Sequence, residues 1–393
     1  MRFLILNAGS SSLKFDLIET GAGAARRLRS GAFIDAHGTL RLESDAAAPS
    51  ATAPLRTLAA AADSLLGWLS GEQLLGELDA TVHRVVHGGE KFRATTALSD
   101  ADLAALASLD ELAPLHNPAA RAVMASVRGR LGAAVPLVAV FDTAYFASLP
   151  EAAWRYAVPA RWYGEHGIRR YGFHGTAHRY LCQAARARLG RTRPTRRIVS
   201  LQLGRGCSVT ATLDERAVAT SMGFTPLEGL VMGTRSGDID PGALLYMLEH
   251  SGLSATQLRS ELNSASGLLG LSGRSADMRE LLELEGRGDA AAALAVEIFC
   301  RRARHYLGAY MSELGGVDVI AFGGGIGEHA AEIRRRILGN FAWAGISIAE
   351  DANRAAGAVS IAAAHSRAAI EVVRVDEASV LADEAVALLQ RAA

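Results

Sequence analysis

Two stretches of this chain share one outline: an apolar strand, a tight turn of small residues and a second strand. In the first, Leu4–Leu6 precedes the turn Asn7–Ser12, and in the second, Ile198–Leu203 precedes the turn Gly204–Ser208. Glycine lets the backbone turn tightly, and hydroxyl and free N–H groups suit anionic oxygens. The repeated hairpin predicts two lobes that clamp one polyphosphate. An ordinary serine turn and simple strand punctuation by glycine are the alternatives.

Length and composition are typical of a globular protein with two domains. The 393 residues exceed the roughly 250–300 at which one core stops growing. Lys+Arg and Asp+Glu both number 41, so no basic excess favours nucleic acid. The three cysteines lie far apart, which argues against zinc and disulfide frameworks and favours a reducing cytoplasm. No apolar run is as long as a membrane span, and no secretory signal is evident, so we expect a cytoplasmic protein without a membrane partner.

Short apolar runs alternate with longer stretches of helical period, which predicts an α/β protein. A third glycine-rich turn, Phe322–His329, follows one such run and is expected to open a helix that continues through Ile337. Backbone N–H groups at a helix start attract phosphates, and glycine permits the close approach of a base. The arginine-rich stretch Arg188–Arg197 lies between a predicted helix and a predicted strand, so we interpret it as a solvated connector.

Four polar residues lie in loops that follow apolar runs. Arg84 lies at a strand end before a glycine pair, and Asp142 directly follows a strand. His174 and Arg235 each have glycines close by, which leaves room for a ligand. A single histidine or arginine is more often structural, but loops at the ends of strands are where ligands and chemistry collect. Together the four residues predict a reaction centre.

These motifs resemble the acetate kinase family. Its two signature segments stand here as Leu4–Phe15 and Met232–Gly242. Further matching segments follow in the expected order over essentially the whole chain: His83–Glu90, Leu112–Pro118, Phe141–Tyr145 and Tyr171–His178. The resemblance implies a duplicated actin/hexokinase-like (ribonuclease H-like) fold, with the nucleotide in the cleft between two domains, and a homodimer. We expect an amino-terminal lobe of residues 1–145 plus 379–393, with the phosphate hairpin and part of the acetate site. A carboxy-terminal lobe of residues 146–378 would bind the nucleotide and dimerise.

The reaction that the resemblance implies is reversible, Mg²⁺-dependent transfer of the γ-phosphoryl group of ATP to acetate, giving acetyl phosphate and ADP. Two anionic groups must then meet, so the site needs cations. Arg84 and Arg235 suit that role because a guanidinium fork can bridge a carboxylate and a phosphoryl oxygen, and we expect them to converge. By resemblance, His174 donates a hydrogen bond to the moving phosphoryl group, His116 assists, and Asp142 is the catalytic carboxylate. Acetate is already deprotonated, so no general base is required.

Family resemblance also implies a metal site and an acetate pocket. Asn7 and Glu377 match the magnesium-associated positions, with Asp376 as the alternative to Glu377, and Mn²⁺ is expected to substitute for Mg²⁺. Magnesium favours few protein oxygens besides phosphate and water. A small apolar pocket for the acetate methyl group is implied at four positions: Val86, Leu115, Phe173 and Pro226. Val86 is larger than the alanine of propionate-preferring relatives, so we expect acetate, although one methylene is worth only about 1–3 kcal/mol.

Nucleotide contacts are implied for the first hairpin and for three further segments. The positions are Ser10, Ser12 and Lys14; Gln202, Leu203, Gly204, Arg205 and Gly206; Asp277, Met278 and Arg279; and Gly325, Ile326, Gly327, Glu328 and His329. The family usually has His, Asn and Asn where this chain has Gln202, Arg205 and His329. Because Arg205 adds bulk and charge beside the phosphates, an altered phosphoryl donor stays open.

Two other classes of protein share such hairpins: sugar kinases and non-catalytic nucleotide-binding modules that assemble like actin. A sugar kinase needs a base for a hydroxyl group and a polar pocket, whereas the implied pocket is apolar and flanked by two arginines. A filament-forming module has no use for Arg84, His174 and Arg235 together. The sequence therefore favours a kinase that acts on acetate, with propionate or another short-chain carboxylate as the alternative acceptor.

Overall fold

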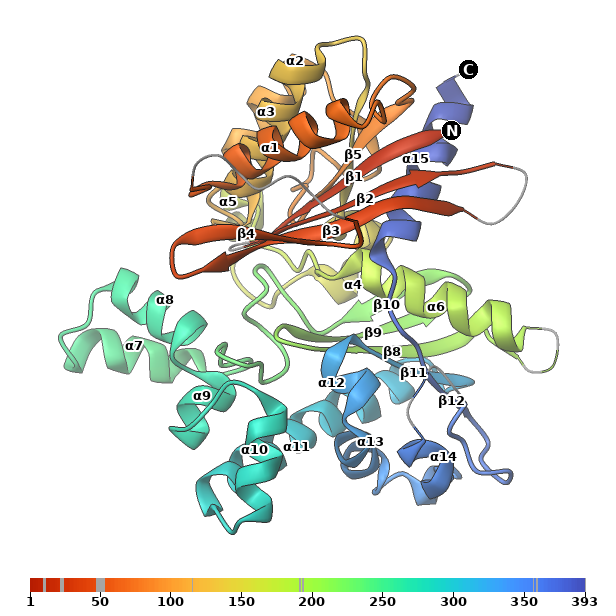
Figure 1. Ribbon diagram of the computed structural model, residues 1–393. Helices are drawn as coiled ribbons and strands as arrows, with labels where there is room; N and C mark the ends of the chain where they lie inside the picture. Colours follow the sequence, from red (N-terminus) through yellow and green to blue (C-terminus); the bar gives the residue numbers. More distant parts are fainter. Residues whose placement is uncertain are drawn as a thin grey trace. The chain divides into compact units, whose positions relative to one another are not determined.

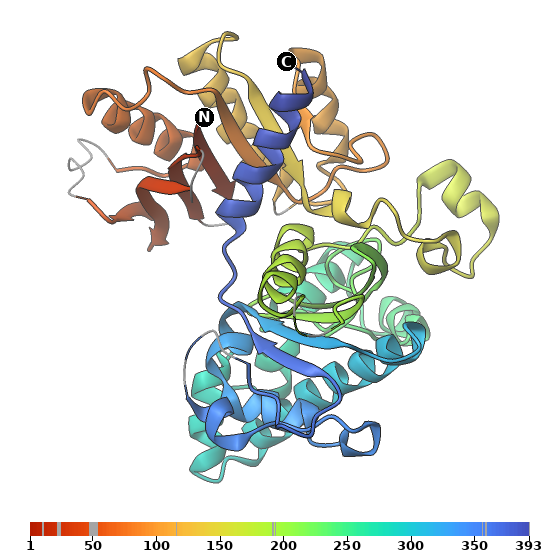
Figure 2. The same cartoon turned by 90° about the vertical axis from the view of Figure 1, so that its right-hand side faces the viewer.

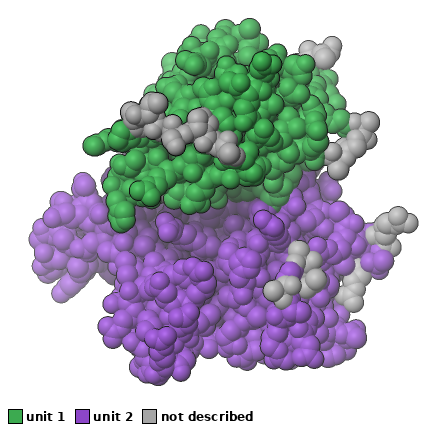
Figure 3. Space-filling view, viewed as in Figure 1, with its two compact units in different colours: residues 1–147, 376–393 green, residues 148–375 purple. Residues whose placement is uncertain are grey.

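The chain divides into two compact units, shown in separate colours in Figure 3. Unit 1 comprises Met1–Ala147 and Asp376–Ala393, and unit 2 comprises Ser148–Val375. The computed structural model describes residues 1–9, 12–21, 25–46, 54–114, 116–190, 192, 194–355, 357 and 360–392. Within those ranges, no helix has both the length and the apolar character needed to cross a bilayer.

Unit 1 is built on a seven-stranded sheet in the order β4-β3-β2-β1-β5-β7-β6. The strands are β1 (Arg2–Ala8), β2 (Ser12–Glu19), β3 (Arg26–Ala36), β4 (Thr39–Ser44), β5 (Ala80–Val85), β6 (Thr96–Ala97) and β7 (Leu137–Phe141). The helices are α1 (Leu58–Gly71), α2 (Asp100–Ala105), η1 (Leu106–Leu109), α3 (Asn117–Leu131), η2 (Asp142–Phe146) and α15 (Glu377–Ala392).

Helices cover both faces of this sheet, as the two views in Figures 1 and 2 show. Side chains alternate between the faces along a strand, so β1 contributes to two cores. Leu4 and Leu6 belong to the core that includes residues of α1 and α3, whereas Phe3 and Ile5 belong to the core that includes α15. Burial on both faces explains why Phe3–Leu6 of β1 and the whole of β7 read as continuous apolar runs in the sequence.

Unit 2 is built on a five-stranded sheet in the order β10-β9-β8-β11-β12. Its strands are β8 (Arg197–Leu203), β9 (Cys207–Leu213), β10 (Arg216–Thr220), β11 (Val319–Gly323) and β12 (Ala369–Val372). Its helices are α4 (Glu151–Trp154), α5 (Ala160–His166), α6 (Gly175–Leu189), α7 (Pro241–His250), α8 (Ala255–Ser264), α9 (Gly267–Ser272), α10 (Met278–Gly286), α11 (Ala290–Glu313), α12 (Gly324–His329), α13 (Ala331–Leu338), η3 (Ala342–Ala344) and α14 (Glu350–Arg354). Helices α6 and α11 pack against this sheet, on opposite faces in Figure 1.

The two sheets repeat one topology. In unit 1, β3, β2 and β1 are antiparallel neighbours, and β5 and β7 continue the sheet parallel to β1. In unit 2, β10, β9 and β8 are antiparallel neighbours, and β11 and β12 continue the sheet parallel to β8. Each half therefore orders its five core strands third, second, first, fourth, fifth. The predicted duplication within an α/β fold is confirmed.

The prediction of a single helix from the third glycine-rich turn through Ile337 is wrong. Helix α12 ends at His329 because Ala330 has non-helical backbone angles, φ −96° and ψ 82°, and α13 begins afterwards. Arg334 stabilises the break, since its Nη1 donates to the carbonyl oxygens of Gly327 and Glu328 at 2.8 and 2.9 Å. A continuous helix would pair those carbonyls with N–H groups four residues later.

The arginine-rich connector is more than a solvated segment. Arg188 Nη1 lies 2.6 Å from Glu371 Oε2, and Arg197 Nη2 lies 2.6 Å from Asp318 Oδ1. Both carboxylates are largely buried, with side-chain exposures of 0% and 9%. The two ends of the connector are thus tied to the sheet of unit 2, which accounts for these arginines without a nucleic-acid partner.

Candidate active site

In unit 1, three predicted site residues gather where the parallel strands end. Asn7 lies near the end of β1 and pairs in register with Arg84 on β5. Asp142 directly follows β7, the strand next to β5. The carboxyl ends of parallel strands meet at one edge of a sheet, which is why residues far apart in the sequence come together here.

Arg84 is held by a carboxylate on one side and an amide on the other. Its Nε and Nη2 donate to Oδ1 and Oδ2 of Asp142 at 3.1 and 2.6 Å, a two-pronged ion pair. Its Nη1 donates to Asn7 Oδ1 at 3.2 Å. Burial opposes the charge on Arg84, but Asp142 and Glu377 outweigh burial and raise the pKa of the guanidinium above its ordinary value. Arg84 is therefore a permanent cation with a fixed orientation.

The structure separates the two candidate metal ligands at the start of α15. Glu377 Oε2 accepts a hydrogen bond from Asn7 Nδ2 at 3.2 Å, so the two predicted metal residues are neighbours. Asp376 Oδ1 instead lies 3.0 Å from Arg27 Nη2 on β3. Glu377 is thus the acidic residue that lies beside Asn7 and Arg84.

The donor set around Asn7 and Glu377 is small. Among the described residues, no group of three or more His, Cys, Asp or Glu side chains is placed to hold a metal ion. One carboxylate and one amide oxygen fit Mg²⁺, because Mg²⁺ takes most of its ligands from phosphate and water when it binds a nucleotide. The residues therefore fit the predicted metal.

The other predicted residues of unit 1 that the structure describes lie on or next to its strands and at the start of α3. His116 immediately precedes α3, and Val86 is a buried residue directly after β5. Lys14 is exposed on β2 and pairs in register with Asn7, and the carbonyl oxygen of Ser12 accepts from Gly9 N at 2.8 Å. The other two predicted residues, Ser10 and Leu115, lie outside the described residues.

In unit 2, His174 and Arg235 meet over Gly206. A Cβ atom at Gly206 would lie 3.2 Å from His174 Nε2 and 3.6 Å from Arg235 Nη1. A larger residue would therefore crowd the His174 ring and come into van der Waals contact with Arg235. Arg235 also donates through Nη1 to the carbonyl oxygen of Pro226 at 3.2 Å. Pro226 and the buried Phe173, both predicted for the acetate pocket, are thus next to predicted catalytic residues.

His174 is oriented by a buried serine. The residue has a left-handed backbone, φ 60°, directly before α6. Its Nδ1 lies 2.8 Å from Ser208 Oγ, which in turn lies 2.7 Å from His178 Nε2. With Nδ1 in contact with the serine, Nε2 is the ring nitrogen that faces the space above Gly206.

Arg235 differs from Arg84 in having no carboxylate partner among the described residues. Besides the Pro226 carbonyl, its Nη1 has only a long contact of 3.7 Å with Met232 Sδ. Burial lowers the pKa of Arg235 below its ordinary value, and nearby Cys207 offsets this only in part. A partly buried cation without a counter-charge is a favourable binding partner for an anionic ligand.

A cavity of about 810 Å³ lies beside these residues in unit 2. Eight predicted nucleotide contacts line it: Gly204, Arg205, Asp277, Met278, Arg279, Gly325, Ile326 and His329. Gly324 lets α12 begin close to β8, since a Cβ atom there would lie 2.6 Å from the carbonyl oxygen of Leu203. The volume falls within the range of about 300–1,000 Å³ usual for small-molecule and cofactor sites.

Four lining residues were missed by the sequence analysis: Ser275, Ala276, Leu282 and Ala330. Three of them adjoin predicted segments, and Leu282 lies one helical turn after Met278 on α10. Helical periodicity could have found Leu282. Five predicted residues of unit 2 do not line the cavity but lie within two positions of a lining residue in the chain: Gln202, Leu203, Gly206, Gly327 and Glu328. Ser12 and Lys14 belong to unit 1. The predicted convergence of Arg84 with Arg235 joins a residue of each unit and stays a prediction.

The chain is similar to known proteins over nearly its whole length. The family model described as "Acetokinase family" matches residues 2–383. An acetate kinase of Solibacter usitatus is 45% identical over 90% of this chain and 89% of its own length. A propionate kinase of Citrobacter rodentium is 40% identical over 97% of this chain and 95% of its own length. The crystal structure of Porphyromonas gingivalis acetate kinase matches with a TM-score of 0.88 and 35% identity, covering 99% of each chain. The fold is therefore the actin/hexokinase-like one expected from the resemblance, and the chain belongs to the acetokinase family of carboxylate phosphotransferases.

Proposed function

We propose that this chain catalyses the reversible, Mg²⁺-dependent, in-line transfer of the γ-phosphoryl group of ATP to acetate, giving acetyl phosphate and ADP. The observation that carries the proposal is the guanidinium of Arg235, which lacks a carboxylate partner among the described residues. Arg235 lies beside Gly206, and Gly204 two residues earlier lines a cavity of nucleotide size. An anionic phosphoryl group would supply the missing counter-charge.

In this proposal, each polar residue of the site has a role in bringing two anionic reactants together. Arg235 and His174 Nε2–H would stabilise the negative charge on the equatorial oxygens of the transferring phosphoryl group. Arg84 would orient the acetate carboxylate, with Asp142 fixing the guanidinium, and His116 would assist. Acetate is already a carboxylate, so no step requires a proton to leave the acceptor.

Asn7 and Glu377 would hold Mg²⁺, and Mn²⁺ is expected to substitute. When bound, the ion would neutralise phosphate charge. Lys14, Ser10 and Ser12 of the first hairpin would contact the phosphates. The cavity residues of unit 2, with Gln202, Leu203, Gly206, Gly327 and Glu328 next to them, would hold the rest of the nucleotide.

Acetate is the proposed acceptor, with propionate or another short-chain carboxylate as the second candidate. Val86, Leu115, Phe173 and Pro226 would enclose the methyl group. The similarity to a propionate kinase supports keeping the alternative, and a diverged Arg205 supports testing other phosphoryl donors.

We also propose a cytoplasmic homodimer that binds neither membranes nor nucleic acid, formed through unit 2. Helix α7 supports this because none of its residues is buried and several of its apolar side chains are exposed. Leu245 and Tyr246 are each 60% exposed, and Met247 and Leu248 each 38%. A second copy of the chain would bury this surface. The three cysteines are buried and none of them is in a disulfide bond, which is consistent with a reducing compartment.

Trapping of acetyl phosphate as its hydroxamate tests the reaction directly. Purified protein with MgATP and acetate should form the hydroxamate, and a panel of acetate, propionate, butyrate and glucose should rank acetate first. Phosphorylation of glucose, or ATP hydrolysis without any acyl phosphate, would contradict the proposal. Replacing ATP with GTP or pyrophosphate in the same assay would identify the phosphoryl donor.

A further inference from the structure

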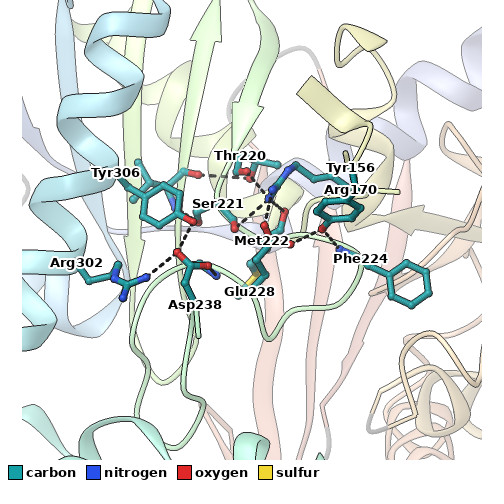
Figure 4. A network of polar contacts seen from close by, with 12 residues as sticks. Tyr156, Arg170, Thr220, Ser221, Met222, Phe224, Glu228, Asp238, Arg302 and Tyr306 are labelled. Atoms are coloured by element: carbon teal, nitrogen blue, oxygen red, sulfur yellow. Dashed lines mark hydrogen bonds and ion pairs between the residues drawn. The ribbon is translucent and has the colours of Figure 1, made fainter. Parts of the chain in front are cut away.

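The predicted catalytic Arg235 lies on a segment without helix or strand, the loop of residues 221–240 between β10 and α7. Loops that carry catalytic groups must be held in place by the surrounding scaffold. The same loop carries Pro226. Figure 4 shows the polar network that surrounds this loop, and the network contacts it at two places.

The first contact site lies at the start of the loop and involves Arg170 and Glu228. Arg170 Nη1 donates to the carbonyl oxygens of Thr220, Ser221 and Met222 at 3.1, 3.2 and 3.1 Å. Its Nη2 donates to Glu228, and the hydroxyl of Tyr156 donates to the same carboxylate. Tyr156 also accepts from Phe224 N at 2.9 Å. This cluster fixes the part of the loop that includes Pro226.

The second contact site is the pairing of Gly229 with Asp238, which closes the segment that carries Arg235; we call this pairing the neck of the loop. Asp238 Oδ1 accepts from Gly229 N at 2.8 Å, and Asp238 N donates to the carbonyl oxygen of Gly229 at 3.0 Å. Residues 230–237 thus form a closed loop between these two anchors. Gly237 has φ +71°, and a Cβ atom there would lie 2.5 Å from the carbonyl oxygen of Leu230, so the neck is also tightly packed.

Helix α11 supplies the partners that hold this neck. Arg302 Nη1 and the hydroxyl of Tyr306 both donate to Asp238 Oδ2, at 2.7 and 2.8 Å. The two residues are four positions apart, so they lie on one face of the helix. Burial and the adjacent Asp238 raise the pKa of Tyr306 above its ordinary value, so its hydroxyl remains a donor. Asp238 is thereby hydrogen-bonded on both oxygens, one inside the loop and one to a rigid helix.

We propose that Asp238, Arg302 and Tyr306 are positioning residues for phosphoryl transfer: they close the neck of the loop and so fix the guanidinium of Arg235. The inference rests on the proposed function. It adds two residues of α11 that contact Asp238 and would act through Arg235. A displacement of about 1 Å in a positioned group can cost on the order of 100-fold in rate, so the loss of one contact should be measurable.

The test compares neighbouring arginines on α11. Arg302→Gln removes a contact to Asp238, whereas Arg301→Gln changes an exposed residue of the same helix and is the matched control. We expect Arg302→Gln to lower kcat about tenfold, with the KM for ATP within about twofold because the nucleotide cavity is untouched. Tyr306→Phe, which deletes one oxygen, should give a smaller decrease in kcat with the same KM pattern. It is the variant to use if Arg302→Gln does not fold.

A double-mutant cycle separates positioning from general structural damage. Each variant is combined with Arg235→Lys, which retains a charge but shortens its reach. If α11 acts through Arg235, Arg302→Gln should lower kcat less than about twofold in that background. Equal losses in both backgrounds, or wild-type kcat in Arg302→Gln and Tyr306→Phe, would refute the inference. If the wild type itself forms no acyl phosphate, the proposed function fails first, and the two failures are thus distinguishable.

Discussion

The two predicted site arginines, one in each unit, have opposite electrostatic surroundings. Arg84 in unit 1 is neutralised by the buried Asp142, which it contacts with two nitrogens at 3.1 and 2.6 Å. Arg235 in unit 2 has a carbonyl and a sulfur as its side-chain contacts and no carboxylate among the described residues. Burial lowers the pKa of Arg235, whereas nearby carboxylates raise the pKa of Arg84.

Because of this difference, the two arginines are suited to different roles. A cation that already has a counter-charge can orient a singly charged acceptor without attracting every anion, and its own position is fixed. A cation without one favours the ligand that brings negative charge, and stabilises charge that grows during the reaction. We therefore expect Arg84 to contribute to both stability and acceptor orientation, and Arg235 to contribute almost only to rate.

The largest expected effect is on the rate of Arg235→Ala. Removing this cation should lower kcat for acetyl phosphate formation about 10³-fold, because one donor at a developing charge is worth roughly 10²–10³. The melting temperature should stay unchanged or rise, since the variant removes a poorly compensated buried charge. Hydroxamate kinetics and thermal unfolding of the same preparation measure both quantities. A kcat within about tenfold of wild type would correspond to only about 1.4 kcal/mol of barrier and would exclude the assigned role.

Arg84→Ala should show the opposite balance between stability and rate. It leaves the carboxylate of Asp142, which is 1% exposed, without its guanidinium. Breaking a buried ion pair by removing one partner costs about 3 kcal/mol or more, so the free energy of unfolding should fall measurably in urea. We expect kcat to fall about 100-fold as well. Arg84→Lys is the control: it keeps a charge near Asp142 and should recover part of the stability. Equal stability of Arg84→Ala and Arg235→Ala would remove the contrast between the units.

Asp142→Asn sharpens the comparison by weakening the pair without removing the cation. An amide offers one acceptor oxygen, so Arg84 should lose its two-pronged contact and kcat should fall about tenfold to 100-fold. Because Arg84 stays protonated and acetate needs no base, the loss should be the same at every pH from about 6 to 9. Loss of an acidic limb from the pH–rate profile in this variant alone would instead assign proton transfer to Asp142.

Much of the arrangement within each unit followed from the sequence for physical reasons. The sequence predicted that Arg84 and Asp142 each lie at the end of a strand, and the two residues meet because parallel strands bring their carboxyl ends to one edge. The repeated hairpins predicted two halves, and the sheets repeat one topology. The nucleotide segments came from family resemblance, and eight of their residues line one cavity.

Other features depended on geometry that no local pattern encodes. Glu377 is the first residue of α15 and lies beside Asn7, whereas Asp376 precedes the helix and lies beside Arg27. Arg302 and Tyr306 read as part of an ordinary amphipathic helix, because their partner Asp238 lies more than sixty residues earlier. Which arginine acquires a carboxylate likewise depends on tertiary placement.

The smallest expected effect is that of a substitution at Arg205. It tests whether the expected contribution of Arg235 to kcat depends on burial or only on the lack of a carboxylate partner. Arg205 lines the cavity that we propose for the nucleotide, and its side chain is exposed. Water screens an exposed cation, so a contact with a nucleotide phosphate should contribute only about 0.2–1 kcal/mol. Arg205→Asn should therefore raise the KM for ATP about two- to fivefold, leave kcat unchanged and weaken the dependence of that KM on salt. Arg216→Asn, an exposed residue at the start of β10, is the matched control. A decrease in kcat as large as that of Arg235→Ala would mean that the absence of a carboxylate partner, not burial, determines what an arginine contributes in this unit.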